Sequence, residues 1–357
     1  MGTALLECAR ARQKGDRPAR LMRISIVVPV HGKAELTARC LHLLRPLVGA
    51  RNDAEVIVVD DGSLDSTREL VGHEHPWVRL IGHDKSEGFA AACNSGAAAA
   101  EGERLLFFNN DLAGEPGWFE TLLAYANSDE RAAVVGCRLL YPNQLIQHAG
   151  IVICADRLPR HVYRLFPRDH LAVRRSRRFQ AVTGACLLVR KSLFLELDGF
   201  DPAFANGFED VDFCLRAGAG GAEVHYCADS TLVHFEAATR RESVTAFRRN
   251  AEVFLGRWGE VLEQDDVRTY LEDGLIRIVP SDVYPLELRV SPELAAVEID
   301  GAIPELFRLL GIRSRQVFDL LKENTLLRVR LGDVEIDRSD VRSLAGQREP
   351  RSLKKWY

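Results

Sequence analysis

The sequence has 357 residues, with 47 Lys+Arg against 51 Asp+Glu and 46% hydrophobic residues. This length can supply one large globular domain and a smaller second one. The near-neutral charge balance gives no electrostatic reason to expect nucleic acid as a partner. No apolar run is long enough to span a bilayer, and the first residues lack a signal-peptide core. We therefore expect a cytoplasmic protein, with the inner face of the cell membrane as an alternative location.

Eight cysteines are scattered along the chain, and none forms a C-x-x-C pair or a Cys/His set with zinc-finger spacing. Several lie within apolar runs, as Cys186 does, where a thiol behaves as a small hydrophobic group. We therefore expect reduced, structural cysteines.

Short apolar runs alternate with helical stretches from Ile24 onward. The expected strands are Ile24–Val30, Ala54–Val59, Val78–Gly82 and Arg104–Phe108. The expected helices between them are Lys33–Leu44, Ser66–Val71 and Phe89–Ala100. Continuous apolar strands separated by helices predict an α/β fold, in which a mostly parallel sheet has helices on both faces.

The second half of the chain has a mixed pattern. We expect a helix that begins at Glu115-Pro116, strands within Val134–Cys154, a strand at Ala185–Val189, helices from Lys191 and from Glu209, two strands (Glu223–Cys227 and one ending at His234), and a helix at Val244–Trp258. The pattern changes again near Asp265. There we expect strands at Leu286–Val290, Val297–Ile299 and Leu326–Leu331 and a helix at Gln316–Lys322.

Three of the four N-terminal strands end in polar, turn-prone clusters. These clusters are His31-Gly32, Asp60-Asp61-Gly62-Ser63 and Asn109-Asn110-Asp111. Ligands of open α/β sheets bind at the carboxyl ends of the strands, which is where these clusters lie. The first strand is not followed by G-x-G-x-x-G, so a dinucleotide-binding domain is disfavoured.

The residue types in these clusters suit a nucleotide and a divalent cation. Asp-Gly is common in tight turns, but two adjacent carboxylates at a strand end repel each other, so a turn alone explains Asp60 and Asp61 poorly. A carboxylate there can accept the imide N–H of a uracil or thymine ring. Asp111, beside two amides, can hold Mg²⁺ or Mn²⁺ that also binds a diphosphate; an Asx-rich turn is the alternative.

A second acidic cluster, Glu209-Asp210-Val211-Asp212, opens a predicted helix. Acids in a first turn complement the helix dipole, but three in four residues exceed that need, so we expect one to be catalytic. Asp212 can instead form an ion pair with Arg216, four residues later. His234, taken alone, is expected to be a structural histidine. Arg174–Arg178 is typical of a solvated loop, with a phosphate-bearing acceptor as the alternative.

Together these motifs resemble family 2 glycosyltransferases, which are inverting enzymes of the GT-A fold, and in particular their rhamnosyltransferase-like bacterial members. The resemblance covers about Ile24 to Trp258. The motifs are Val28-Pro29-Val30-His31, Val58-Val59-Asp60-Asp61-Gly62-Ser63, Glu87-Gly88-Phe89 with Asn94, Asn109-Asn110-Asp111, Gly184-Ala185, Gly199-Phe200-Asp201, Glu209-Asp210-Val211-Asp212 and His234.

The resemblance implies a role for each matching residue. Asp210 would be the general base that deprotonates the acceptor hydroxyl. Asp60 and Asp61 would contact the base and ribose of the donor. The whole set that would bind the donor nucleotide is Pro29, His31, Asp60, Asp61, Glu87, Gly88, Asn94 and Asn110. The metal site would contain Asp111, Asn109 and His234, and the acceptor site Gly184, Glu209 and Asp212.

One departure from the family pattern concerns the metal. Asn109 stands where the full D-x-D motif has its first Asp, and an amide supplies an oxygen but no charge. We therefore expect weaker or more donor-dependent binding of Mg²⁺ or Mn²⁺. The implied function is inverting transfer of a sugar from a UDP- or dTDP-linked donor to a glycan or glycolipid acceptor, in surface polysaccharide or glycoconjugate biosynthesis.

The resulting domain prediction has three parts: a disordered lead (1–22), a GT-A domain (23–262) with a donor half (23–112) and an acceptor half (113–262), and a small α+β C-terminal module (263–357). Two other functions stay open. A sugar-nucleotidyltransferase would need a Gly-rich, basic loop after the first strand, which Pro29–Lys33 lacks. A non-catalytic nucleotide-sugar-binding scaffold would dock a membrane or a partner protein through 263–357.

Overall fold

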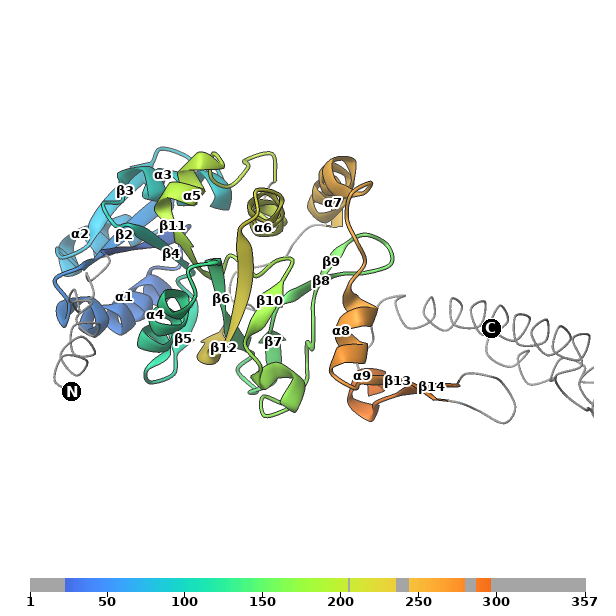
Figure 1. The fold of residues 1–357 in the computed structure, drawn as a ribbon. Helices are drawn as coiled ribbons and strands as arrows, with labels where there is room; N and C mark the ends of the chain where they lie inside the picture. Colours follow the sequence, from blue (N-terminus) through green and yellow to red (C-terminus); the bar gives the residue numbers. More distant parts are fainter. Residues whose placement is uncertain (1–22, 205, 236–243, 280–286, 297–357) are drawn as a thin grey trace, which may run out of the picture. The chain divides into compact units, whose positions relative to one another are not determined.

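The structure is a computed structural model that describes residues 23–204, 206–235, 244–279 and 287–296 (Figure 1). The chain divides into two compact units, Met1–Arg268 and Thr269–Tyr357. Among the helices of the described ranges, none has both the length and the apolar character that crossing a membrane requires. The described cysteines are buried and free.

The first unit is built on one mixed sheet of ten strands (Figure 1). Its main path runs in the order β10 (Arg177–Phe179), β12 (Glu223–His234), β6 (Ala132–Leu140), β11 (Cys186–Arg190), β4 (Arg104–Phe108), β1 (Ile24–Val30), β2 (Ala54–Asp61), β3 (Arg79–His83). Off this path, β5 (Leu112–Gly114) pairs with β12 and β7 (Ile146–His148) with β6. A separate pair joins β8 (Ile151–Ile153) to β9 (Pro159–His161).

The strand directions bring distant parts of the chain to one edge of the sheet. Strands β1 to β4 are parallel, while β11 is antiparallel to both β4 and β6. Strand β6 therefore runs in the same direction as β4, and β12 is parallel to β6. The carboxyl ends of β1, β2, β4 and β12 consequently share one edge with the beginning of β11. We call it the carboxyl edge.

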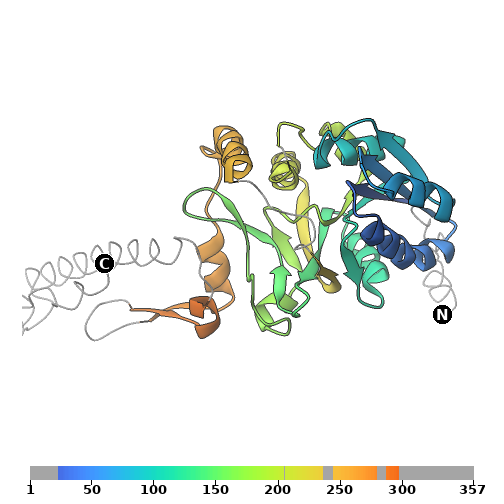
Figure 2. The same cartoon turned by 180° about the vertical axis from the view of Figure 1, so that it is seen from behind.

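Helices cover both faces of the sheet, as the two opposite views show (Figures 1 and 2). On one face lie α1 (Ala34–Gly49) and α4 (Trp118–Ser128), and on the other α3 (Phe89–Ala99), α5 (Lys191–Glu196) and α6 (Glu209–Ala219). The remaining described helices of this unit are α2 (Thr67–Glu74), η1 (Leu171–Arg174), α7 (Val244–Trp258) and α8 (Asp266–Glu272), the last of which crosses the unit boundary.

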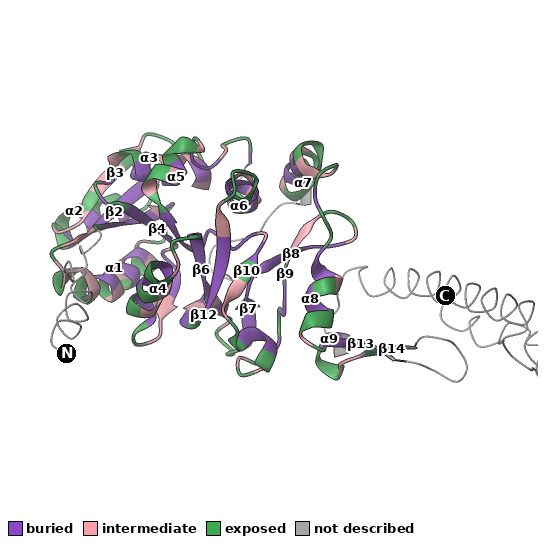
Figure 3. Cartoon of the chain, viewed as in Figure 1, coloured by how far each residue is buried: buried purple, intermediate pink, exposed green. Residues whose placement is uncertain are grey.

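Alternating strand side chains supply the two halves of the core. Phe108 stacks on Trp118 of α4, with ring centroids 5.2 Å apart, whereas its neighbour Phe107 lies 4.8 Å from Phe194 of α5. Both phenylalanines are fully buried, as are most strand residues (Figure 3). Because the strands are covered on both sides, they are apolar without the alternation of half-exposed strands. This burial on both faces agrees with the predicted α/β fold.

Two predicted elements differ from the structure. Helix α4 begins at Trp118 rather than at Glu115-Pro116, because Gly117 has a left-handed φ of 78° that interrupts the helical backbone. The two predicted strands near residues 223 and 234 form one twelve-residue strand, β12. A register shift against β6 between Cys227 and Thr231 marks the irregularity that separated them in the sequence pattern.

The second unit contains an antiparallel pair of strands, β13 (Ile276–Val279) and β14 (Glu287–Val290), followed by α9 (Pro292–Ala296). Strand β14 corresponds to the predicted strand at Leu286–Val290. The elements expected at Val297–Ile299, Gln316–Lys322 and Leu326–Leu331 lie outside the described residues. The lead at 1–22 lies outside them too, and the boundary at 263 stays a prediction.

Candidate active site

Backbone and side-chain hydrogen bonds join the loops that follow β1, β2 and β3. Nδ1 of His31 lies 2.7 Å from the carbonyl oxygen of Asp61, and the N–H of Gly32 donates to Oγ of Ser63 at 2.6 Å. Gly62 makes the turn between these contacts possible. Its φ is +67°, and a Cβ there would lie 2.5 Å from the carbonyl carbon of Lys85.

Asp61 holds the loop after β3 in place. Its carboxylate accepts the backbone N–H groups of Glu87 and Gly88 at 2.8 and 2.9 Å, and the hydroxyl of Ser86 at 2.7 Å. Nδ1 of His83 lies 2.8 Å from the same carboxylate. Burial alone would raise the pKa of Asp61, but these hydrogen bonds outweigh it and lower the pKa below the usual value. Asp61 therefore shapes the loop that carries Glu87 and Gly88.

Asp60 is completely buried and has its own partners. Nε of Arg68, on α2, donates to Oδ2 of Asp60 at 2.7 Å, and the backbone N–H of Ser63 donates to Oδ1 at 3.1 Å. Arg68 also donates to the carbonyl oxygen of His83 at 2.7 Å. The guanidinium of Arg68 is half exposed, so it is Arg68 that presents a polar surface beside the strand end.

Asp111 and His234 meet at the carboxyl edge, although they are far apart in the sequence. Oδ1 of Asp111 lies 3.1 Å from Nε2 of His234, and both residues are buried. The chain segments are also joined, because the N–H of Phe235 donates to the carbonyl oxygen of Asp111 at 3.0 Å. On the other side of the imidazole ring, Nδ1 lies 2.8 Å from Oε1 of Gln147.

The geometry of this pair suits a divalent cation. Two ligands at right angles around Mg²⁺ are separated by about 3 Å when each metal–ligand bond is about 2.1 Å long. The observed 3.1 Å between Asp111 and His234 matches that separation. The carboxylate of Asp111 suits Mg²⁺ or Mn²⁺, whereas an imidazole ligand is more typical of transition metals and so favours Mn²⁺ over Mg²⁺. Two protein ligands leave positions for oxygens of a diphosphate.

The asparagines before Asp111 support the loop. Nδ2 of Asn110 donates to Oγ1 of Thr37, on α1, at 3.0 Å. The backbone N–H of Asn109 donates to the carbonyl oxygen of Ala185 at 2.9 Å, which joins the end of β4 to the start of β11. Asn110 therefore has a structural partner, and its predicted contact with the nucleotide stays a prediction.

Asp210 lies at the N-terminus of α6 and faces the start of β11. Its Oδ2 accepts the backbone N–H of Gly184 at 2.7 Å. A Cβ on Gly184 would lie 3.1 Å from Cβ of Asp210, so the absence of a side chain there permits the close approach. Asn206, Gly207 and Phe208, just before the helix, all have positive φ values (56°, 138° and 74°). Such backbone strain is concentrated at functional sites.

Two residues predicted to bind the acceptor have other roles in the structure. Asp212 is fully buried and accepts three hydrogen bonds, from Nε of Arg216 at 2.8 Å, from Arg257 at 2.6 Å and from Nε1 of Trp258 at 2.9 Å. In the structure Asp212 thus joins α6 to α7 and forms a buried ion pair with Arg216, and its contact with an acceptor stays a prediction. Glu209, also buried, accepts the N–H of Gly207.

Asn94, predicted to line the nucleotide site, also has structural partners. Both of its amide functions bind the backbone of Phe200, with Nδ2 donating to the carbonyl oxygen at 2.7 Å and Oδ1 accepting the N–H at 2.9 Å. These bonds connect α3 to the loop between α5 and α6. Asn94 therefore connects these two segments, and its predicted contact with the nucleotide stays a prediction.

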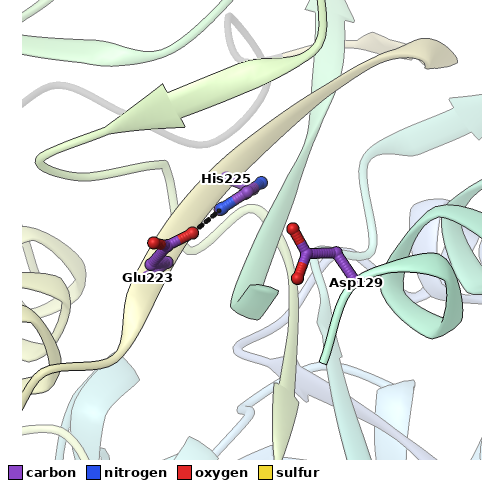
Figure 4. A group of neighbouring side chains, drawn as sticks. All are labelled: Asp129, Glu223 and His225. Carbon is purple, nitrogen blue, oxygen red and sulfur yellow. Dashed lines mark hydrogen bonds and ion pairs between the residues drawn. The ribbon is translucent and has the colours of Figure 1, made fainter. Parts of the chain in front are cut away.

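A different group of described side chains that could hold a metal ion lies at the opposite edge of the sheet. Asp129, Glu223 and His225 come together where β6 and β12 begin (Figure 4). Arg131 donates to Asp129 at 2.9 Å, and Nε2 of His225 lies 2.9 Å from Glu223. Since Arg131 already pairs with Asp129, and the carboxyl edge is at the other end of the strands, we favour Asp111 and His234.

Sequence reasoning missed Arg68 and Gln147. Neither belongs to a motif, and each is recognised only by the carboxylate or histidine that it contacts in space. A weak signal existed for Arg68, which lies in the first turn of α2, shortly after the acidic turn. No signal in the sequence indicated Gln147.

The sheet order and the helices on both faces correspond to the GT-A fold. Two solved structures share the fold: GalNAc-T7 with UDP, GalNAc and Mn²⁺ (18% identity, 67% of this chain, 48% of that chain, TM-score 0.53) and a mannosyltransferase from Pyrobaculum calidifontis with GDP-Man and Mn²⁺ (19%, 71%, 69%, 0.51). At these identities the likeness shows the fold alone.

Part of the sequence matches a family model. Residues 25–196 match the model of glycosyl transferase family 2, so the chain carries a glycosyltransferase domain of that family. The match ends before α6 and His234. Similar curated proteins are the O-antigen biosynthesis protein RfbC of Myxococcus xanthus (31% identical, 61% of this chain, 18% of that protein) and the N-acetylglucosaminyl-diphospho-decaprenol L-rhamnosyltransferase of Mycobacterium tuberculosis (26%, 56%, 74%).

A third relative is the pre-mycofactocin glycosyltransferase of M. tuberculosis, 30% identical over 59% of this chain and 42% of that protein. The aligned part of the chain thus spans less than half of RfbC and of this third relative.

Proposed function

We propose that the protein is an inverting glycosyltransferase that moves a sugar from a UDP- or dTDP-linked donor to a glycan or glycolipid acceptor, with Mn²⁺ or Mg²⁺ bound at Asp111 and His234. The observation that carries the proposal is the convergence at the carboxyl edge. The carboxylates of Asp60 and Asp61, the Asp111–His234 pair and the helix start with Asp210 all lie there, although β4 and β12 are more than a hundred residues apart.

The donor nucleotide would lie over the loops after β1, β2 and β3. Pro29, His31, Glu87 and Gly88 lie in or beside these loops. Asp60 and Asp61 would act mainly by holding them, because their carboxylates already have partners. Arg68 would present its half-exposed guanidinium to the carbonyl oxygens of a pyrimidine base or to the ribose. Uracil and thymine share those carbonyl groups, so both donor types fit.

The diphosphate would bind near Asp111, His234 and Asn109. A divalent cation at this position would stabilise the negative charge that grows on the departing nucleoside diphosphate. Asp111 and His234 hold two of its ligand atoms at a fixed separation of 3.1 Å. Asn109 contributes no charge, so the donor itself supplies much of the cation's negative environment. Binding of the metal and of the nucleotide should therefore be cooperative.

Asp210 is the proposed general base. A sugar hydroxyl is a poor nucleophile until a base within hydrogen-bonding reach removes its proton. The backbone N–H groups of Gly184 and Val211 donate to Oδ2 and Oδ1 of Asp210 at 2.7 and 2.8 Å, and together they fix the orientation of the carboxylate. A base and a leaving group on opposite sides of the anomeric carbon give in-line displacement and inversion. Gly184 and the strained turn before α6 would lie beside the acceptor.

The acceptor class rests on the relatives. One similar protein is named for rhamnosyl transfer to N-acetylglucosaminyl-diphospho-decaprenol, and another for O-antigen biosynthesis. We propose an acceptor of the same chemical class, a lipid-linked or free glycan in surface polysaccharide or glycoconjugate biosynthesis.

A thermal-shift panel tests the proposal. UDP-glucose, UDP-galactose, UDP-N-acetylglucosamine and dTDP-L-rhamnose would each be added with Mn²⁺, with Mn²⁺ alone and ATP as controls. A donor at 100 times its Kd should stabilise the fold by about 2.7 kcal/mol. Stabilisation by none of the pyrimidine nucleotides would overturn the proposal. Binding without nucleoside diphosphate release over a broad acceptor panel would favour the scaffold alternative, and pyrophosphate release from a nucleoside triphosphate and a sugar phosphate the nucleotidyltransferase.

A further inference from the structure

The imidazole ring of His234 is bound on both sides by buried polar residues. Oε1 of Gln147 lies 2.8 Å from Nδ1, and Oδ1 of Asp111 lies 3.1 Å from Nε2. The sheet itself places Gln147 there. Leu140 of β6 pairs with Ile146 of β7 on one side and with Val233 of β12 on the other. Gln147 directly follows Ile146, and His234 directly follows Val233, so the pairing with β6 brings these two residues close together.

The contact with Gln147 fixes which ring nitrogen carries the proton. An amide oxygen is only an acceptor, so Nδ1 of His234 must donate to it. A neutral imidazole has a single N–H, and Nε2 therefore presents its lone pair toward the carboxylate of Asp111. Two acceptors 3.1 Å apart repel each other unless a proton or a metal cation lies between them. A metal ion bound by both side chains would supply that positive charge.

We propose that Gln147 is a positioning residue of the metal site: it holds His234 in the Nδ1–H tautomer and directs Nε2 at the cation that Asp111 binds. The role rests on the proposed metal-dependent transfer. Histidine ligands of metals commonly donate their other N–H to a fixed acceptor, and loss of that acceptor typically weakens metal binding by about 10–100-fold. Gln147 is buried, so water cannot easily replace its oxygen.

Direct binding of Mn²⁺ tests the role without an activity assay. The electron paramagnetic resonance signal of free Mn²⁺ disappears on binding, and it would be titrated against the full chain with saturating UDP. Gln147→Met keeps the length of the side chain and removes the acceptor, and Gln147→Glu keeps an acceptor. We expect about 10–100-fold weaker binding in Gln147→Met and binding within about threefold of wild type in Gln147→Glu.

Ile146→Val is the matched control, because it loosens the packing of the same strand and leaves the acceptor intact. It should bind Mn²⁺ like the wild type. Gln147→Met that binds Mn²⁺ as tightly as the wild type would overturn the positioning role. Failure of the wild type itself to bind Mn²⁺ with UDP would instead overturn the proposed metal dependence, so the two failures are distinguishable.

A second measurement needs no folded variant at position 147. Long-range ¹H–¹⁵N NMR correlations report the tautomer of each histidine, and His234→Gln identifies the relevant signals by their loss. In the wild type above pH 8 and without metal, we expect Nδ1 of His234 protonated and Nε2 unprotonated. The opposite tautomer, with Nε2–H directed at Asp111, would mean that Gln147 presents its amide nitrogen and would refute the assignment.

Discussion

Asp212 is the residue for which a structural and a substrate-binding role make the most different predictions. Its carboxylate is fully buried and accepts hydrogen bonds from Arg216, Arg257 and Trp258. Asp212→Asn keeps the size of the side chain but turns an amide N–H₂ toward at least one of these donors. It also removes the carboxylate that pairs with Arg216, whereas Arg257 keeps its ion pair with Asp201.

The size of the effect follows from the burial of the partners. Breaking a fully buried ion pair on one side costs about 3–5 kcal/mol. The guanidinium side chains of Arg216 and Arg257 are 21% and 35% exposed, so solvent compensates part of the loss. We therefore expect the low end, about 3 kcal/mol. For a unit of this size each kcal/mol lowers Tm by roughly 2–4 °C, which gives a decrease of roughly 6–12 °C.

Thermal unfolding followed by circular dichroism measures this effect, and Glu120→Gln, a change at an exposed acid of α4, serves as the control. The control should unfold within about 1 °C of the wild type, since surface changes usually cost less than 0.5 kcal/mol. If Asp212 instead bound the acceptor, its replacement would leave Tm unchanged and raise the KM for the acceptor. An unchanged Tm would refute the structural role.

Three further predictions concern other parts of the first unit. The pKa of Asp61 is lowered in the fold, so its carboxylate contributes stability above about pH 4 that is lost as pH falls through the folded pKa. The urea midpoints at pH 7 and pH 3.5 should therefore differ less in Asp61→Asn than in the wild type. Equal differences in the two proteins would contradict this prediction. Gly96→Ala should destabilise by about 1–3 kcal/mol, since a Cβ there would lie 2.3 Å from Cγ1 of Val27. Gly72→Ala should be neutral or stabilising, because a Cβ there would have no atom within 4 Å. Chemical denaturation that finds Gly72→Ala less stable than Gly96→Ala would contradict the packing described around Gly96. Asn109→Asp should tighten Mn²⁺ binding severalfold in the resonance titration, because it adds a charge beside Asp111; weaker binding would place Asn109 away from the cation.

The strand ends were predictable because buried parallel strands are continuous apolar runs with polar turns after them. Strand β1, strand β4 and helix α7 have the bounds that the sequence pattern predicts. The apolar runs alone therefore suffice to place the polar clusters that follow them on one edge of the sheet. The direction of β11 was not predictable in this way, because a single apolar run is compatible with either direction in a sheet. That direction is what brings Gly184 to Asp210.

The roles of individual acids were harder to predict, because they depend on partners distant in the sequence. Asp210 and Asp212 are two residues apart in one acidic cluster. Asp212 is buried because Arg257 and Trp258, 45 and 46 residues later, donate to it. Asp61 looked like a group free to bind a ligand, yet four donors from residues 83–88 surround it. Composition and motif spacing do not indicate contacts between residues that are distant in the sequence.

The central claim is that Asp210 is the base of a sugar transfer and does not hold the donor. Its most direct test compares wild type and Asp210→Asn with the donor selected by the thermal-shift panel, Mn²⁺ and lipid-linked glycan acceptors, by measuring product formation and donor binding together. We predict that the rate of transfer falls by about 10²–10⁴-fold while the donor still raises Tm as in the wild type. Transfer at the wild-type rate by Asp210→Asn would contradict the account.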